Sequence, residues 1–175
     1  LGVDFDRKPD GTFDLSKEGG HSENRILHHK DNTGEAVENA LVASVRRNPN
    51  IEVLENHFAI EILTQHHLGV EVKRGRKDIK CYGAYVCDLN NPSVITFLSR
   101  VTVMATGGVG NVYLTTTNPE TATGDGITMV YRAKGIVENM EFIQFHPTSL
   151  YDPGRRPSFL ITEALRGYGA VLKNL

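Results

Sequence analysis

The sequence lacks several features that would assign it to a specialised class of protein. It has only two cysteines, Cys81 and Cys87, six positions apart in one strand-like run. A strand rises roughly 3.3 Å per residue, so this spacing is too long for a disulfide and both thiols are predicted to be reduced. No apolar run approaches the roughly 20 residues of a membrane-spanning helix, and no signal peptide is visible. We therefore expect a cytoplasmic protein without a membrane span.

An excess of charge of one sign is also missing. The 19 Lys and Arg residues nearly balance the 21 Asp and Glu residues, which gives a formal net charge of -2. No bulk attraction to nucleic acid or to an anionic membrane follows. The basic run over 74–77 could indicate a nucleic-acid patch, but a solvated hairpin tip is its usual meaning, and we expect no nucleic-acid partner. The pair His28 and His29 lacks the i, i+4 spacing of a helical metal site, as does the pair His66 and His67, and no metal is expected.

The 175 residues suffice for one domain with a core of its own. The chain begins at Leu1 without an initiator Met, and it stops at Leu175 inside an apolar run. These ends are typical of the interior of a longer protein. We therefore expect an internal fragment.

Apolar periodicity predicts two helices and a β-rich middle region. Apolar residues at Val37, Leu41 and Val45 predict an amphipathic helix that ends at Arg46-Arg47. A second helix is predicted over 127–134, with Gly135 as its C-cap. Consecutive strands joined by short polar turns predict an antiparallel meander. The strands are predicted over 51–54, 58–63, 70–72, 79–87, 94–98, 101–105 and 137–145, and the strand over 101–105, which shows little alternation, is expected to be covered on both faces.

A glycine turn after the strand over 101–105 is the first candidate binding element. It consists of Ala105, Thr106, Gly107 and Gly108. Ligands of open α/β sheets bind at the carboxyl ends of strands, and glycine lets a ligand approach the backbone. The spacing is not G-x-G-x-x-G, and a tight turn that needs positive φ explains the Gly pair equally well.

A second glycine-containing stretch, 123–126, precedes the second predicted helix. The free N–H groups at a helix N-terminus suit a phosphate or a polar ring edge. Asp125 in this stretch could accept a hydrogen bond from a ribose hydroxyl or a ring N–H, or it could be an ordinary helix N-cap.

A third group of candidates lies near the C-terminus. His146 follows the strand predicted over 137–145, and Thr162, Glu163 and Arg166 fall within about one helical turn. A histidine with a threonine hydroxyl could bind a substrate carboxylate, while a glutamate with an arginine could relay a proton. A helical ion pair explains Glu163 and Arg166 equally well, and a core histidine explains His146.

Five motifs occur in order along nearly the whole chain. They are Thr106-Gly-Gly108, Thr117-Asn-Pro119, Thr123-Gly-Asp-Gly-Ile127, Glu141-Phe-Ile-Gln-Phe-His-Pro-Thr148 and Leu160-Ile-Thr-Glu-Ala-Leu-Arg-Gly167. Together they resemble the flavoproteins of the succinate dehydrogenase/fumarate reductase family. Within that family, Glu18-Gly-Gly-His-Ser-x-x-Arg-Ile-Leu-His28 and Asp31-x-Thr-Gly34 are most similar to the L-aspartate oxidase branch.

The resemblance implies an FAD-dependent oxidoreductase that converts L-aspartate to iminoaspartate, the first step of de novo NAD biosynthesis, with oxygen or fumarate as the acceptor. It implies a small dicarboxylate substrate and quinolinate synthase as a pathway partner. A fumarate reductase or succinate dehydrogenase flavoprotein subunit is the alternative, and a non-enzymatic nucleotide-binding module is a more remote one.

Roles for individual residues follow from the same resemblance. His146 and Thr162 would bind the substrate, and Glu163 with Arg166 would form a catalytic proton relay. The residues implied in FAD binding are Ala59, Ile60, Ala105, Thr106, Gly107, Gly108 and Asp125.

The implied fold is mixed α/β (α+β). Residues 1–145 would be part of an FAD-binding Rossmann-like domain with an inserted antiparallel β-meander, and residues 146–175 would begin a capping domain that binds substrate. The glycine fingerprint for the pyrophosphate would lie before Leu1. We therefore expect the fragment alone to be inactive and to bind FAD weakly or not at all.

Overall fold

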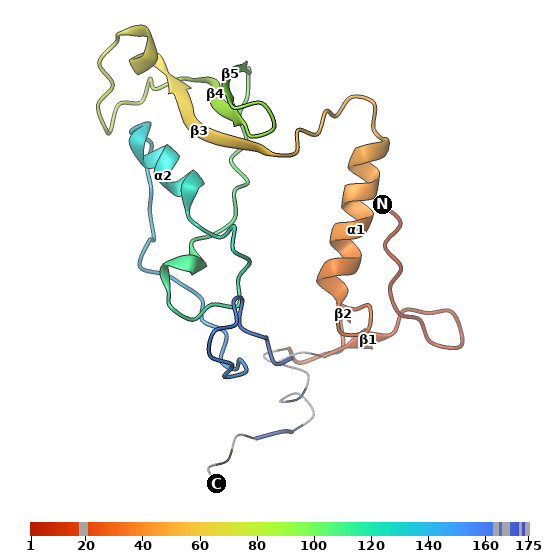
Figure 1. Cartoon of the computed structure of the whole chain (residues 1–175). Helices are drawn as coiled ribbons and strands as arrows, with labels where there is room; N and C mark the ends of the chain where they lie inside the picture. The colour runs from red at the N-terminus through yellow and green to blue at the C-terminus, as the bar shows by residue number, and fades with distance from the viewer. Residues whose placement is uncertain (18–20, 163–164, 166–168, 172, 174–175) are drawn as a thin grey trace. The chain divides into compact units, whose positions relative to one another are not determined.

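The computed structural model describes residues 1–17, 21–162, 165, 169–171 and 173. The chain forms two compact units, which Figure 1 shows in ribbon form. The first unit comprises Leu1–Val53 and Ile161–Leu175, and the second comprises Leu54–Leu160. The second unit carries most of the candidate site residues.

The first unit contains two very short strands and the longer helix of the chain. Strand β1 (Leu15–Ser16) pairs antiparallel with β2 (Ile26–Leu27). An antiparallel bridge between Arg7 and Phe13 closes a small hairpin near the N-terminus.

Helix α1 (Thr33–Arg47) confirms the first predicted helix, including its end at Arg46-Arg47. Its apolar positions recur with helical period, and the polar run that begins at Asn48 ends it. Glu35 lies in the first turn, and Arg46 and Arg47 lie in the last. These charges complement the helix dipole, which is positive at the N-terminus and negative at the C-terminus.

The second unit is built on the predicted antiparallel meander. Strands β3 (His57–Thr64), β4 (Cys81–Asp88) and β5 (Ser93–Leu98) form one sheet in the order β3-β4-β5. A short 3₁₀ turn, η1 (Gln65–Leu68), follows β3. Both cysteines are free, as predicted.

Strand β3 contains a bulge at Ile60. Ala59 pairs with Val86, and Glu61 pairs with the adjacent residue of β4, Tyr85, so Ile60 has no partner position in the ladder. A bulge leaves the backbone groups of the extra residue available to other elements. The helix over 125–132 uses the Ile60 carbonyl oxygen in this way.

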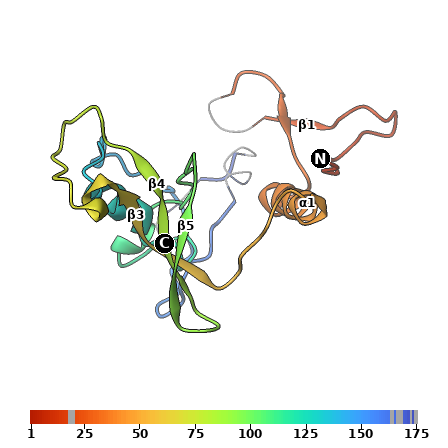
Figure 2. The same ribbon diagram turned by 90° about the horizontal axis from the view of Figure 1, so that it is seen from above.

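Helix α2 (Asp125–Arg132) packs against β3, below this strand in Figure 1 and behind it in the view from above in Figure 2. It begins and ends two residues earlier than the predicted 127–134. Gly124 precedes it in the left-handed conformation, with φ 79°, and Ala133 rather than Gly135 is its C-cap. The left-handed residue at the end of the helix is Lys134, with φ 65°. Lys134 N donates to Tyr131 O, and Gly135 N donates to Val130 O. This pattern is a Schellman motif, and it moves the left-handed position one residue before the glycine.

Four predicted strands are wrong. Residues 51–54, 70–72, 101–105 and 137–145 belong to no strand in the structure. A strand needs a neighbour to satisfy its N–H and C=O groups, and no described strand is paired with any of these segments.

The structure shows why two of these segments, 101–105 and 137–145, are not strands. Val101 and Val103 are 79% and 81% exposed, so 101–105 is not covered on both faces as predicted. In 137–145, Asn139 is left-handed (φ 59°) and its carbonyl accepts a hydrogen bond from Phe142 N, which turns the chain.

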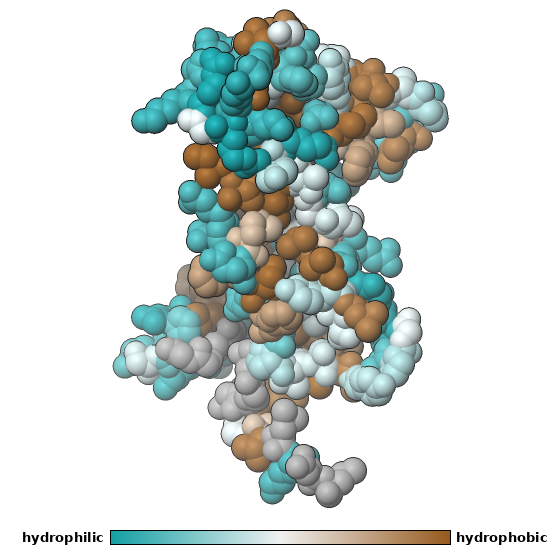
Figure 3. All heavy atoms as spheres, turned by 90° about the vertical axis from the view of Figure 1, so that its left-hand side faces the viewer, coloured by the Kyte–Doolittle hydropathy of each residue, from teal (hydrophilic) through white to brown (hydrophobic). Residues whose placement is uncertain are grey.

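Burial among the described residues is limited to a small centre in the second unit. The buried apolar side chains are Ile62 and Leu63 of β3, Met129 of α2, and Ala122. Figure 3 shows many apolar side chains open on the face it draws. Within the described ranges, neither α-helix has the length and apolar character that crossing a bilayer requires.

Candidate functional site

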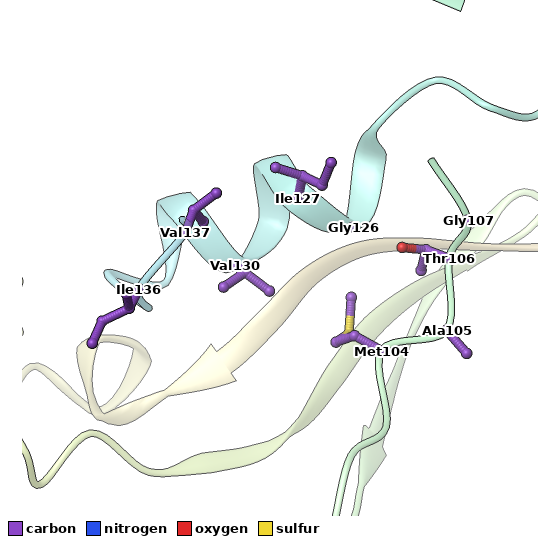
Figure 4. Close-up of a pocket in the computed structure, with 9 residues that line it drawn as sticks. All are labelled: Met104, Ala105, Thr106, Gly107, Gly126, Ile127, Val130, Ile136 and Val137. Carbon is purple, nitrogen blue, oxygen red and sulfur yellow. The ribbon is translucent and has the colours of Figure 1, made fainter. Parts of the chain in front are cut away.

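A pocket of about 310 Å³ lies between the glycine turn and helix α2 (Figure 4). The turn supplies one wall, the first two turns of α2 supply the second, and the segment after the helix contributes Ile136 and Val137. Figure 4 shows the Met104 side chain pointing toward the helix and Thr106 facing the helix start at Gly126. The lining residues are Met104, Ala105, Thr106, Gly107, Gly126, Ile127, Val130, Ile136 and Val137.

The glycine turn and helix α2, the two walls of the pocket, are in contact at Gly126. A Cβ built on Gly126 would stand 1.8 Å from Thr106 Oγ1, so a larger residue at position 126 would force Thr106 or the helix to shift. Beside this contact, Gly124 N donates a hydrogen bond of 3.1 Å to Gly108 O. The glycine turn and the helix N-terminus are therefore held together directly, a contact that the sequence analysis did not predict.

The glycine turn presents bare backbone. Gly107 has φ 69°, and a Cβ added at Gly107 or at Gly108 would meet no atom within 4 Å. A ligand can therefore reach the main chain of both residues. The volume is at the lower end of the roughly 300–1,000 Å³ typical of ligand pockets, so the pocket suits one part of a large cofactor.

Asp125 is the first residue of α2; it is exposed and does not line the pocket. Its Oδ2 accepts a hydrogen bond of 2.5 Å from Thr123 Oγ1, and no side-chain capping bond is present at this helix start. The carboxylate is therefore not an ordinary N-cap. It is held by Thr123 at the helix end where polar ligand groups are favoured.

Ala59 and Ile60 lie in β3 at the bulge, and neither lines the pocket. They are half-buried. The main-chain oxygen of Ile60 accepts a hydrogen bond of 2.7 Å from Arg132 Nη2. Strand β3 is thus tied to the far end of the helix whose first turns form the pocket wall.

His146 is half-buried, and its ring is oriented by Thr148. His146 Nδ1 lies 3.2 Å from Thr148 N and 2.9 Å from Thr148 O, so it accepts from the amide in one tautomer and donates to the carbonyl in the other. Thr162 belongs to the other compact unit. Glu163 and Arg166 lie outside the described residues.

Sequence reasoning missed two arginines that hold α2. Arg132 bonds the bulge in β3, and Arg74 donates to Tyr131 O at 3.2 Å and to Gly135 O at 3.1 Å. Arg74 also stacks on the Tyr131 ring, with its guanidinium carbon 4.2 Å from the ring centroid. A basic run in sequence gives no signal of such contacts, because they depend on tertiary packing. In the part of the chain that is described, no three His, Cys, Asp or Glu side chains gather in a group able to hold a metal ion.

The profile of a protein family described as FAD binding domain matches residues 1–174. The chain belongs to this family of FAD-binding proteins. Among curated relatives, L-aspartate oxidase 2-b, chloroplastic, of Nicotiana tabacum is 47% identical over 182 residues, which cover 100% of this chain and 27% of the relative. L-aspartate oxidase 1 of Ralstonia nicotianae is 51% identical over 173 residues, 98% of this chain and 31% of the relative. The chain thus spans about a third or less of these relatives.

Among solved structures, E. coli quinol fumarate reductase FrdA is similar with a TM-score of 0.77 and 29% identity. The match covers 95% of this chain and 26% of that chain. The predicted fold class, a mixed α/β segment of an FAD-binding domain that carries antiparallel strands, is confirmed. The predicted cofactor, FAD, is the one that the family description names. Bare glycine backbone beside a helix N-terminus suits the polar and phosphate-bearing parts of such a dinucleotide.

Proposed function

We propose that the chain is a segment of an FAD-dependent L-aspartate oxidase, an enzyme that oxidises L-aspartate to iminoaspartate. One observation carries this proposal. Nearly the whole chain is 47% and 51% identical to two proteins named L-aspartate oxidase, and only 29% identical to the fumarate reductase structure. Oxygen or fumarate would accept the electrons, and the product would pass to quinolinate synthase in NAD biosynthesis.

The glycine turn and the start of α2 would hold the adenosine side of the cofactor. Ala105, Thr106, Gly107 and Gly108 offer exposed backbone for close approach, and Asp125 offers an acceptor at the helix start. Ala59 and Ile60 would lie near the adenine. FAD, when bound, supplies the redox chemistry, and the chain supplies binding and orientation.

Substrate recognition would use His146 and Thr162 on a carboxylate, and Glu163 with Arg166 would move the proton. His146 is already oriented by Thr148, which reduces the entropy lost when a ligand is positioned. The boundary between the FAD-binding domain, 1–145, and the capping domain, from 146, would place His146 at the start of the cap.

Substrate choice tests the proposal. The full-length protein, purified with FAD, should turn over L-aspartate and produce iminoaspartate, and it should not oxidise succinate at a comparable rate. His146→Gln should raise KM for L-aspartate, because the charged or donating ring is replaced by a differently placed amide. Oxidation of succinate without oxidation of L-aspartate would overturn the assignment and support the alternative.

The alternative is a fumarate reductase or succinate dehydrogenase flavoprotein subunit. The TM-score of 0.77 to quinol fumarate reductase FrdA is compatible with it, because the same scaffold can carry either activity. The higher sequence identity to the oxidases supports the oxidase proposal over this alternative.

The separate chain gives a second test. Titration of residues 1–175 with FAD should show weak binding or none, and tight stoichiometric binding would contradict this expectation. A cytoplasmic location also remains a prediction, since the tobacco relative is described as chloroplastic. Fractionation of the native source would decide it.

A further inference from the structure

We propose that Arg132 is a positioning residue for the FAD pocket, because it fastens helix α2 to the bulge in β3 and thereby fixes the spacing of the pocket walls. This inference deepens the proposed function and rests on its assignment of the pocket to FAD. It concerns a residue outside the lining of the pocket.

The guanidinium of Arg132 makes two contacts with neighbouring residues of β3. Its Nη2 donates to Ile60 O at 2.7 Å, and its Nε lies 3.3 Å from Glu61 Oε1. The carbonyl of Ile60 is open to this bond because the bulge leaves Ile60 without a partner position on β4. The bulge at Ile60 and the Arg132 side chain therefore form a single connection between β3 and α2, called here the Arg132–Ile60 joint.

This joint acts on the pocket through a rigid element. Helix α2 is eight residues long, with Arg132 as its last residue and Gly126 in its first turn. Ile127 and Val130, on the same helix, line the pocket. A short helix moves as a unit, so loosening its end at β3 shifts the wall that meets Thr106.

The carbonyl bond matters more than the ion pair. The side chains of Arg132 and Glu61 are 44% and 32% exposed, and such pairs contribute little because water screens them. A guanidinium meets both oxygens with donors fixed in a planar fork, whereas the three donors of a lysine ammonium sit on one nitrogen and do not reproduce this geometry. The geometry of Arg132, and not only its charge, sets the position of the helix.

The test compares Arg132→Ala and Arg132→Lys with Arg76→Ala in the full-length protein. Arg76 is the matched control, since it is an exposed arginine paired with Asp78 and does not contact α2. Apoprotein is titrated with FAD, and KM for L-aspartate is measured at saturating FAD. We expect Arg132→Ala to weaken FAD binding roughly tenfold, the order expected for one charge-assisted hydrogen bond. Arg132→Lys should recover part of this loss, and Arg76→Ala should match the wild type.

The pattern of effects separates positioning from plain stability. A purely structural role would lower the melting temperature of the apoprotein but leave the FAD affinity of folded protein and KM unchanged. FAD affinity equal to that of the wild type in both Arg132 variants, or an equal loss in Arg76→Ala, overturns the inference. If Arg132→Ala does not fold, Arg132→Lys decides alone. A wild-type protein that binds FAD but fails to oxidise L-aspartate would overturn the proposed function and leave this comparison valid.

Discussion

The side-chain oxygen of Thr106 occupies the space in which residue 126 would carry a side chain, since a Cβ on Gly126 would stand 1.8 Å from it. The side chain of Thr106 therefore lies against the backbone of Gly126 in the first turn of α2. Gly126 is buried at this contact. A side chain at position 126 would therefore force Thr106 or the helix start to shift.

Gly126→Ala should disrupt this contact. The added methyl group forces Thr106 or the helix start to move, and overpacking of this kind costs about 1–3 kcal/mol of the free energy of unfolding. Thermal unfolding of the full-length protein with and without FAD measures both the stability loss and the weakened cofactor binding. Gly34→Ala in α1 is the control, because a Cβ there meets no atom within 4 Å. Wild-type stability and FAD affinity in Gly126→Ala would contradict the contact.

Lys134→Gly should stabilise the protein. Lys134 has φ 65°, in the left-handed region that costs an L-residue roughly 1–2 kcal/mol, and glycine is the usual residue at this position of a Schellman motif. The extra freedom of glycine in the unfolded chain offsets part of the gain, so we expect about 0.5–1 kcal/mol. Denaturant unfolding measures this change in the free energy of unfolding. Ala133→Gly is the control and should lower that free energy, because Ala133 has φ -67°, which needs no glycine. A loss of stability in Lys134→Gly would refute the assigned end of α2.

Local sequence pattern was sufficient for α1 and for the β3-β4-β5 meander. In both, the partners are near in sequence: helical bonds span four residues, and each strand pairs with the next. The glycine turn at Gly107 was also predictable, because positive φ and close approach call for the same residue. Local rules succeed where the interaction is itself local.

The same rules failed for 101–105 and 137–145. Both segments are apolar enough for strands, but a strand is defined by its partner, and the described residues provide none. The joint between Arg132 and Ile60 was missed for a related reason, because it spans 72 positions and depends on a bulge that alternation does not reveal. Apolar pattern identifies candidates for burial, and tertiary contacts decide which are used.

Lowering the pH should destabilise the N-terminal hairpin closed by the Arg7–Phe13 bridge, because it protonates Asp6. The pKa of Asp6 is lowered, chiefly because its Oδ2 accepts a hydrogen bond of 2.6 Å from Lys30 N and secondly because it pairs with His28 at 2.9 Å. A carboxylate with a lowered pKa stabilises the fold above its unfolded pKa of about 3.9, and this stabilisation is lost as pH falls through the folded value. Hydrogen exchange at the Lys30 amide should therefore accelerate, beyond the intrinsic pH effect, as pH drops below about 4.

Asp6→Asn provides the comparison for this pH dependence. An amide does not titrate in this range, so protection of the Lys30 amide should lose its acid-dependent component in Asp6→Asn. Asp4→Asn should retain it, because the Lys30 amide bonds Asp6 and not Asp4. Identical acid profiles for the wild type and Asp6→Asn would show that another group controls the hairpin.

Asn111→Asp should destabilise the loop that follows the glycine turn. Asn111 Nδ2 donates to Pro119 O and to Glu120 O, both at 2.8 Å, and its Oδ1 accepts from Arg156 Nη2 at 3.2 Å. Aspartate keeps the contact with Arg156 but replaces two donor bonds with a carboxylate facing two carbonyls. We expect a loss of about 1–3 kcal/mol in the free energy of unfolding, measured by denaturant titration. Asn50→Asp, at an exposed turn, should change it little, and equal effects of the two substitutions would mean that the side-chain amide of Asn111 does not hold the loop.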